Sequence, residues 1–134
     1  MAYRYSQLTD LTSYLDKRLL VQLTSDTQLV DPDNVGNINA VILQACENAA
    51  ADRIDNELRY YYQMPLTGII PSCIKQINCL ITLKILYERR GLVPAYVQKL
   101  FDAQINRLED MRSPTPKERL INVPLVGKPD NQGM

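Results

Sequence analysis

The chain has 134 residues, the length of one domain, and this length can bury a hydrophobic core without disulfide or metal support. Its composition is 46% hydrophobic and 22% charged with a formal net charge of +0, which is typical of a globular protein. No apolar run approaches the ~20 residues of a membrane helix, and the first residues lack a signal-peptide pattern. We therefore expect no membrane partner, and a location inside a cell or in a particle assembled there.

Charge divides the chain into an acidic first part and a basic second part. Residues 1–58 carry nine acids and four bases, whereas residues 59–134 carry six acids and eleven bases. Oppositely charged ends can pack head to tail between copies, a geometry that closes into rings or extends into filaments. The alternative is that the two halves pack on each other within one chain and neutralise there.

Two short helices and a loop begin the chain. Ser6 is predicted to cap the first helix, because leucines follow it at helical spacing, and residues 17–23 form a second short helix. The segment DPDNVGN in the following loop partly matches a calcium loop, but Val35 and Ile42 occupy two of the ligand positions. We favour a turn in which Asn34 or Asn37 caps the next helix.

One long helix is predicted from about residue 38 to residue 62, because this stretch is rich in helix formers and contains no Gly or Pro. Its apolar residues form two stripes on different faces, an early one of Ile38, Val41, Ile42, Ala45 and Ala49 and a late one of Ala50, Ile54, Leu58 and Tyr61. We therefore expect the helix to pack against different neighbours near its two ends.

Three carboxylates on this helix, Glu47, Asp52 and Asp55, are candidates for a cluster, but solvated surface charges are the favoured interpretation. Asp55 lies near the apolar face between Ile54 and Leu58. If Asp55 is buried, it should bond to a donor such as a tyrosine hydroxyl or a backbone amide at the turn that follows.

The long helix must end in the segment RYYYQMPLTGIIP, residues 59–71, which we call the elbow. The first proline of the elbow cannot donate a backbone hydrogen bond, and the second suits the first turn of the next helix. Successive tyrosines point about 100° apart along a helix, so at least one of the three should face solvent or a neighbouring chain. The candidate joint and subunit-interface residues are Tyr60, Tyr61, Tyr62, Pro65 and Pro71.

Two further helices and a tail complete the chain. Residues 72–90 are apolar around most of the helix circumference, which indicates a central helix, and residues 94–111 form an amphipathic one. Residues 112–134 hold four of the eight prolines, and their one apolar patch is LINVPLV. The predicted fold is all-α, a small helical bundle over residues 1–111 with an extended proline-rich C-terminal tail over 112–134.

Reactive chemistry is sparse in the sequence. The chain has no histidine, which is the commonest general base and metal ligand, and its five glycines form no phosphate-binding motif. Cys46, Cys73 and Cys79 lie in apolar helical contexts without a C-x-x-C pair, so we interpret them as buried structural thiols. We therefore predict no enzyme activity, no catalytic residue, no cofactor and no metal site.

Several short motifs follow one another in a familiar order: LTDL after Tyr5, LVQLT, RIDNEL (53–58), YQMPL (62–66), IIP and LYERR (86–90). Over residues 3–110 this order resembles the Mu-like phage head-completion proteins, also called head–tail connectors or adaptors. In that family an EIDxYL-type segment runs into RYxLPL and VP. This chain departs from the pattern at Arg53, where the family has an acid, and at Tyr61, where it usually has Arg.

The resemblance implies a structural virion protein at the neck, present in the host cytoplasm during assembly. Such proteins form a homo-oligomeric ring, expected to contain about twelve copies, beneath the portal protein. The ring extends the channel through which DNA passes without sequence-specific contact, and it is the docking platform for a neck or tail-completion protein. By analogy of position with related adaptors, the portal-binding residues of the tail are Leu120, Ile121, Val123, Leu125 and Val126.

Two alternatives stay open. One is a different phage neck or tail-completion interaction protein built on the same bundle. The other, from a different class, is a small helical DNA-binding regulator that uses bases of the second half, although no helix carries a dense basic stripe. Ring formation with a partner favours the first two hypotheses, and a salt-sensitive DNA shift favours the third.

Overall fold

Five α-helices and one short 3-10 helix make up the computed structural model, which describes residues 2–25, 31–112 and 120. The helices are α1 (Leu8–Tyr14), α2 (Lys17–Thr24), α3 (Ala40–Leu58), α4 (Ser72–Arg89) and α5 (Ala95–Met111), with the 3-10 helix η1 at Val35–Asn37. No strand occurs in these ranges, so the predicted all-α class is confirmed for the described chain. No helix in the same ranges has the length and apolar character needed to cross a membrane.

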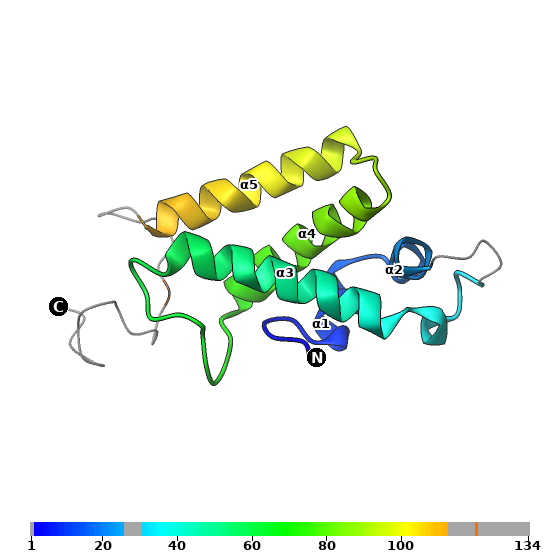
Figure 1. The fold of residues 1–134 in the computed structure, drawn as a ribbon, viewed down its shortest axis with the longest axis horizontal. Helices are drawn as coiled ribbons and strands as arrows, with labels where there is room; N and C mark the ends of the chain where they lie inside the picture. The colour runs from blue at the N-terminus through cyan, green and yellow to red at the C-terminus, as the bar shows by residue number, and fades with distance from the viewer. Residues whose placement is uncertain (1, 26–30, 113–119, 121–134) are drawn as a thin grey trace.

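Helix α4 is the centre of the bundle. It packs against α1, α2, α3 and α5, and α3 also contacts α5 (Figure 1). Eight of its residues are buried, which confirms the prediction of a central helix. The elbow joins α3 to α4 at one end of the molecule, whereas α2, η1 and the α4–α5 turn lie at the other end (Figure 1).

The hydrophobic core has two parts. The part beside the elbow contains Tyr5, Ile54, Leu58, Tyr62, Leu66, Ile74, Ile77, Leu108, Met111 and Leu120 among others. The part under α1 and α2 contains Leu11, Leu15, Leu20, Leu23, Leu43, Cys46, Cys79, Leu83, Leu86 and Val97. Because α4 contributes residues to both parts, it spans the core from the elbow to the opposite end of the bundle.

Helix α3 buries one face along its whole length, which differs from the expectation of two faces. The buried residues are Leu43, Cys46, Glu47, Ala50, Ala51, Ile54 and Leu58. The expected early stripe is largely exposed within the chain, with Val41 at 73% of its maximal accessibility and Ala45 and Ala49 also exposed. Alanines lie on several faces of α3, so the apolar pattern does not identify one buried face. The buried face also includes Glu47, which an apolar pattern leaves out.

Two predicted helix caps are corrected by the structure. Asn39 caps α3, because its side-chain oxygen accepts the N–H groups of Val41 (3.1 Å) and Ile42 (3.2 Å). Asn34 instead forms a local turn with the N–H of Gly36. At the first helix the cap is Gln7 rather than Ser6.

The end of α2 is closed by arginines from the end of α4. Arg89 donates to the carbonyl of Leu23 (3.1 Å), and Arg90 donates to the carbonyls of Gln22 and Ser25. The last carbonyls of a helix lack partners within it, so guanidinium groups satisfy them and also oppose the negative end of the helix dipole. Both arginines therefore fasten α2 to α4.

Candidate functional site

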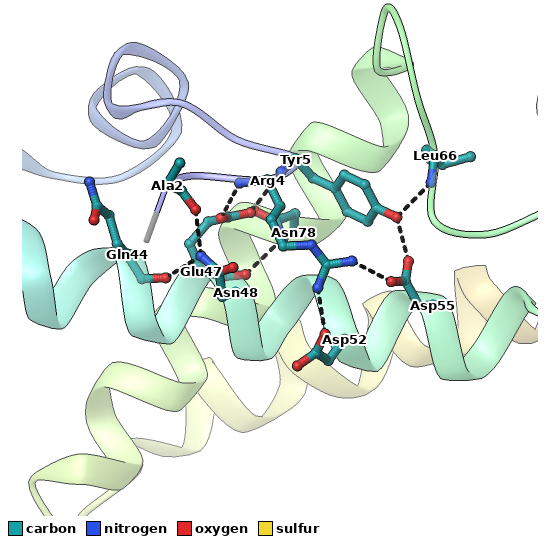
Figure 2. Close-up of polar contacts among 10 residues, drawn as sticks. All are labelled: Ala2, Arg4, Tyr5, Gln44, Glu47, Asn48, Asp52, Asp55, Leu66 and Asn78. Atoms are coloured by element: carbon teal, nitrogen blue, oxygen red, sulfur yellow. Dashed lines mark hydrogen bonds and ion pairs between the residues drawn. The ribbon is translucent and has the colours of Figure 1, made fainter.

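A polar network lies in the interior where the N-terminal segment, residues 2–6, meets α3 (Figure 2). Glu47 is fully buried there, and its carboxylate accepts three consecutive backbone N–H groups, those of Arg4 (2.6 Å), Tyr5 (2.9 Å) and Ser6 (3.3 Å). A buried carboxylate is stable when several donors converge on it. The interpretation of Glu47 as a solvated surface charge is therefore wrong.

Arg4 and Tyr5 extend this contact along α3. The Arg4 guanidinium pairs with both Asp52 and Asp55, and the Tyr5 hydroxyl donates to the other oxygen of Asp55 (Figure 2). Burial, and after it the hydrogen bond to Asp55, raises the pKa of Tyr5 well above its ordinary range. The expected tyrosine–Asp55 bond is confirmed, and its donor is Tyr5.

Tyr5 also reaches the elbow. Its hydroxyl oxygen accepts the backbone N–H of Leu66 at 2.9 Å, so one phenol links the N-terminal segment, α3 and the elbow. Leu66 and Tyr62 are themselves buried in the adjacent core. Because these contacts fix the start and the middle of the loop, the network sets the direction in which the rest of the elbow projects.

The elbow presents its remaining aromatic and aliphatic side chains to solvent. Tyr60 is 71% exposed, Tyr61 47% and Ile69 96%, whereas Tyr62 is 2% exposed. The Arg59 guanidinium lies 5.0 Å from the centre of the Tyr60 ring and donates to the Tyr60 hydroxyl at 3.1 Å. Exposed tyrosine, isoleucine and arginine form the composition typical of protein interfaces.

The prolines and the glycine of the elbow shape this loop. Pro65 is exposed and follows a cis peptide bond, and Pro71 occupies the cap position of α4, one residue before the expected first turn. Gly68 has a φ of +73°, which glycine adopts without the steric cost that other residues meet. The role of the elbow residues in a subunit interface stays a prediction.

The tail residues divide between described and undescribed positions. Leu120 is 4% exposed and packs in the core beside the elbow, so its side chain is occupied by its own chain. Ile121, Val123, Leu125 and Val126 lie outside the described residues. Their assignment as portal-binding residues stays a prediction.

The three cysteines lie in or near the core. Cys46 and Cys79 are buried and Cys73 is half-buried, which confirms the interpretation of buried thiols for the first two. Burial raises the pKa of Cys79 to about 11, and the thiol donates to the Ser6 hydroxyl at 3.3 Å. Such thiols are poor nucleophiles because little thiolate forms near neutral pH.

The acidic turn before α3 is held by local contacts. Asp31 accepts the backbone N–H of Asp33 at 3.0 Å, and Asp33 pairs with Arg18 at 3.2 Å. Among the described residues, no group of three or more histidine, cysteine, aspartate or glutamate side chains has the arrangement of a metal site.

The two oppositely charged halves pack on each other in the bundle. Lys75 pairs with Asp10 (3.6 Å) and Arg112 with Glu57 (3.4 Å), both across the boundary between the halves. This is the alternative of internal neutralisation, but it is incomplete, because neither Asp31, in the turn before α3, nor Arg59, just after α3, forms an ion pair among the described residues.

The polar network was not predicted as a unit. Its partners lie more than forty residues apart in the sequence, and the acceptor binds main-chain groups that no side-chain pattern marks. One signal was available, because Glu47 lies at helical spacing from Leu43, Ala50 and Ala51 and so shares their face.

Comparison with known proteins gives one family. A family model described as "Bacteriophage Mu, Gp36" matches residues 5–116, which include all five helices. Comparison with curated proteins gives no match, and comparison with solved structures gives none either.

Proposed function

Because the chain belongs to the bacteriophage Mu Gp36 family, we propose that this phage protein is a structural component of the virion neck that connects head and tail. The observation that carries the proposal is the family match over residues 5–116, from the buried Tyr5 to beyond the end of α5. The match makes the helical body, rather than an appended segment, the part of the chain that defines the family.

In the proposed role, copies of the chain form a ring of about twelve beneath the portal protein. The ring extends the DNA channel and offers a platform to the next neck or tail-completion protein. The exposed Tyr60, Tyr61 and Ile69 support an assembly role, because several large apolar side chains exposed on one loop are the material of an interaction patch. The protein acts by binding and positioning, and we propose no catalytic role.

The C-terminal residues have a separate part in this proposal. Leu120 anchors the chain in the core beside the elbow, and the apolar residues after it, from Ile121 to Val126, are proposed to contact the portal. Because the anchor is next to the elbow, the proposed portal contact starts at the elbow end of the bundle.

A phage in which this gene is deleted tests the proposal. We expect DNA-filled heads and finished tails that remain separate, and rescue of joined particles by the wild-type chain and by the surface variant Lys99→Glu. Electron microscopy counts the particles, and mass spectrometry of purified virions checks that the chain is a component.

Other outcomes favour the other candidates. A chain recovered on free tails, but not on heads, identifies a tail-completion protein. Loss of both heads and tails with changed transcript levels identifies a regulator. Normal infectious particles from the deletion phage overturn the proposal.

A further inference from the structure

We infer that the two ends of α3 are the two halves of a contact between copies of this chain, with the elbow of one copy seated on the acidic turn of the next. The inference rests on the proposed function in that it names the surfaces by which the proposed ring closes.

The elbow surface consists of Arg59, Tyr60, Tyr61 and Ile69. Ile69 is 96% exposed and Tyr60 71% exposed, so the apolar area here is open to a partner. Arg59 is the one ionisable residue of the elbow other than its tyrosines, and it meets no carboxylate among the described residues. This surface is therefore apolar, aromatic and positively charged.

The acidic turn surface consists of Asp31, Asp33 and Val41. Residues 31–39 carry two acids and no base, and the Asp31 carboxylate meets no cation among the described residues. Val41, in the first turn of α3, is 73% exposed. Asp33 is paired with Arg18, so the negative charge without a cationic partner among the described residues is that of Asp31. This charge lies beside an exposed aliphatic side chain, so the surface complements Arg59 and the apolar side chains of the elbow surface.

The elbow and the acidic turn lie beyond opposite ends of α3, as Figure 1 shows. Helix α3 has 19 residues and is therefore about 28 Å long. The two surfaces cannot meet within one chain. A head-to-tail contact between such surfaces produces rings or filaments, whereas a reciprocal two-fold dimer would require the α3 helices of two copies to lie antiparallel and side by side.

The helix dipole offers a competing reason for the charges, because acids favour the N-terminus of a helix and bases its C-terminus. It does not account for the exposure of Ile69, Tyr60 and Val41. Apolar surface has a higher free energy in water than in a covered interface, so this exposure is unfavourable wherever the surface stays uncovered. A contact between copies explains the charges and the exposed apolar side chains together.

A charge exchange across the contact tests the inference. Sedimentation velocity over a concentration series, with the portal ring absent and then present, compares wild type with Arg59→Glu, Asp31→Lys and the double variant. Each single variant should weaken self-association about tenfold or more, because it places like charges opposite each other. The double variant should recover it, because the pair is restored with its signs exchanged.

Mixing gives the sharpest prediction. The double variant should associate with itself but not with wild type, because every mixed contact then joins like charges. Lys99→Glu, the matched control on the exposed side of α5, should associate as wild type does. Circular dichroism and thermal melting confirm that each single variant is folded.

The failure of this inference differs from the failure of the proposed function. If wild type stays monomeric with and without the portal, or if the double variant is no better than the singles, the contact is overturned. Portal binding by such chains leaves the connector proposal standing. Self-association with the predicted charge rules, but without portal binding, supports the contact and counts against the connector proposal.

Discussion

Glu47 gives the backbone of residues 4–6 the acceptor that a neighbouring strand would otherwise provide. The segment has no helix or sheet partner of its own, and its buried N–H groups must still be paired. The Glu47 side chain of α3 accepts the N–H groups of all three residues. The salt-bridged Arg4 and the buried phenol of Tyr5 add further contacts to α3. The N-terminal segment is therefore part of the fold.

Replacement of Glu47 by Gln tests whether this carboxylate stabilises the fold by accepting the backbone N–H groups. The amide keeps the shape but turns one oxygen into a donor that faces backbone donors, so the free energy of unfolding should fall by about 2–3 kcal/mol. Urea unfolding followed by circular dichroism measures the loss. Asp52→Asn is the matched control, because its side chain is 70% exposed and its ion pair contributes at most about 1 kcal/mol. Equal losses for both variants would contradict the account.

The buried thiol of Cys79 predicts a pH dependence. Its pKa rises from an ordinary 9.0 to about 11 in the folded chain, so above pH 9 the unfolded state loses the proton first. The contribution to stability is complete below about pH 9 and is lost as the pH rises through about 11.

Urea unfolding between about pH 8 and pH 11 checks this dependence. Stability should fall less steeply with pH in Cys79→Ala than in wild type, whereas Cys73→Ala should follow the wild-type slope because it retains the Cys79 thiol. Parallel curves for wild type and Cys79→Ala would show that this thiol does not titrate differently on unfolding.

At the element scale, Leu120 extends the fold beyond α5. Leu→Ala at a buried site removes contacts and leaves a cavity, so Leu120→Ala should lower the free energy of unfolding by about 2–4 kcal/mol. Leu92→Ala, at a residue that is 74% exposed, should change it by less than about 0.5 kcal/mol. If the two variants unfold alike, Leu120 belongs to a separate tail and not to the core.

The helices were predictable from the sequence because local signals define them. Apolar residues around α4 predicted its central place, and Gly91, with a φ of +80°, follows its end as expected. The later part of the buried face of α3, with Ala50, Ile54 and Leu58, was predicted correctly. The earlier part was not, because it includes Glu47, which is buried only where the N-terminal backbone meets it. The capping of α2 by Arg89 and Arg90 is likewise a contact between residues more than sixty positions apart.

The elbow part of the candidate site was predictable where local spacing decides the environment of a side chain. The spacing of Tyr60, Tyr61 and Tyr62 required different environments, and the structure exposes the first two and buries the third. The exposure of Ile69 could not be predicted from its apolar neighbours, since it depends on the path of the loop around Gly68. The link from Tyr5 to Leu66 that fixes this path joins residues 61 positions apart.

The two ends of the whole bundle differ in charge and in the side chains that they expose. Helix α4 contributes to both parts of the core, from the elbow to the opposite end, and α3 is followed by the elbow surface and preceded by the acidic turn. In the proposed ring, such a subunit would transmit position between neighbouring copies, because its packed core leaves little freedom between the two surfaces.

Co-sedimentation of the full-length chain with the portal ring of the same phage tests the connector proposal most directly. We expect the chain to enter the pellet with the portal and to saturate near about one copy per portal subunit. Free chain without portal, and portal mixed with an unrelated helical protein of similar size, are the controls. A chain that stays in the supernatant at every concentration while the portal sediments would contradict the account.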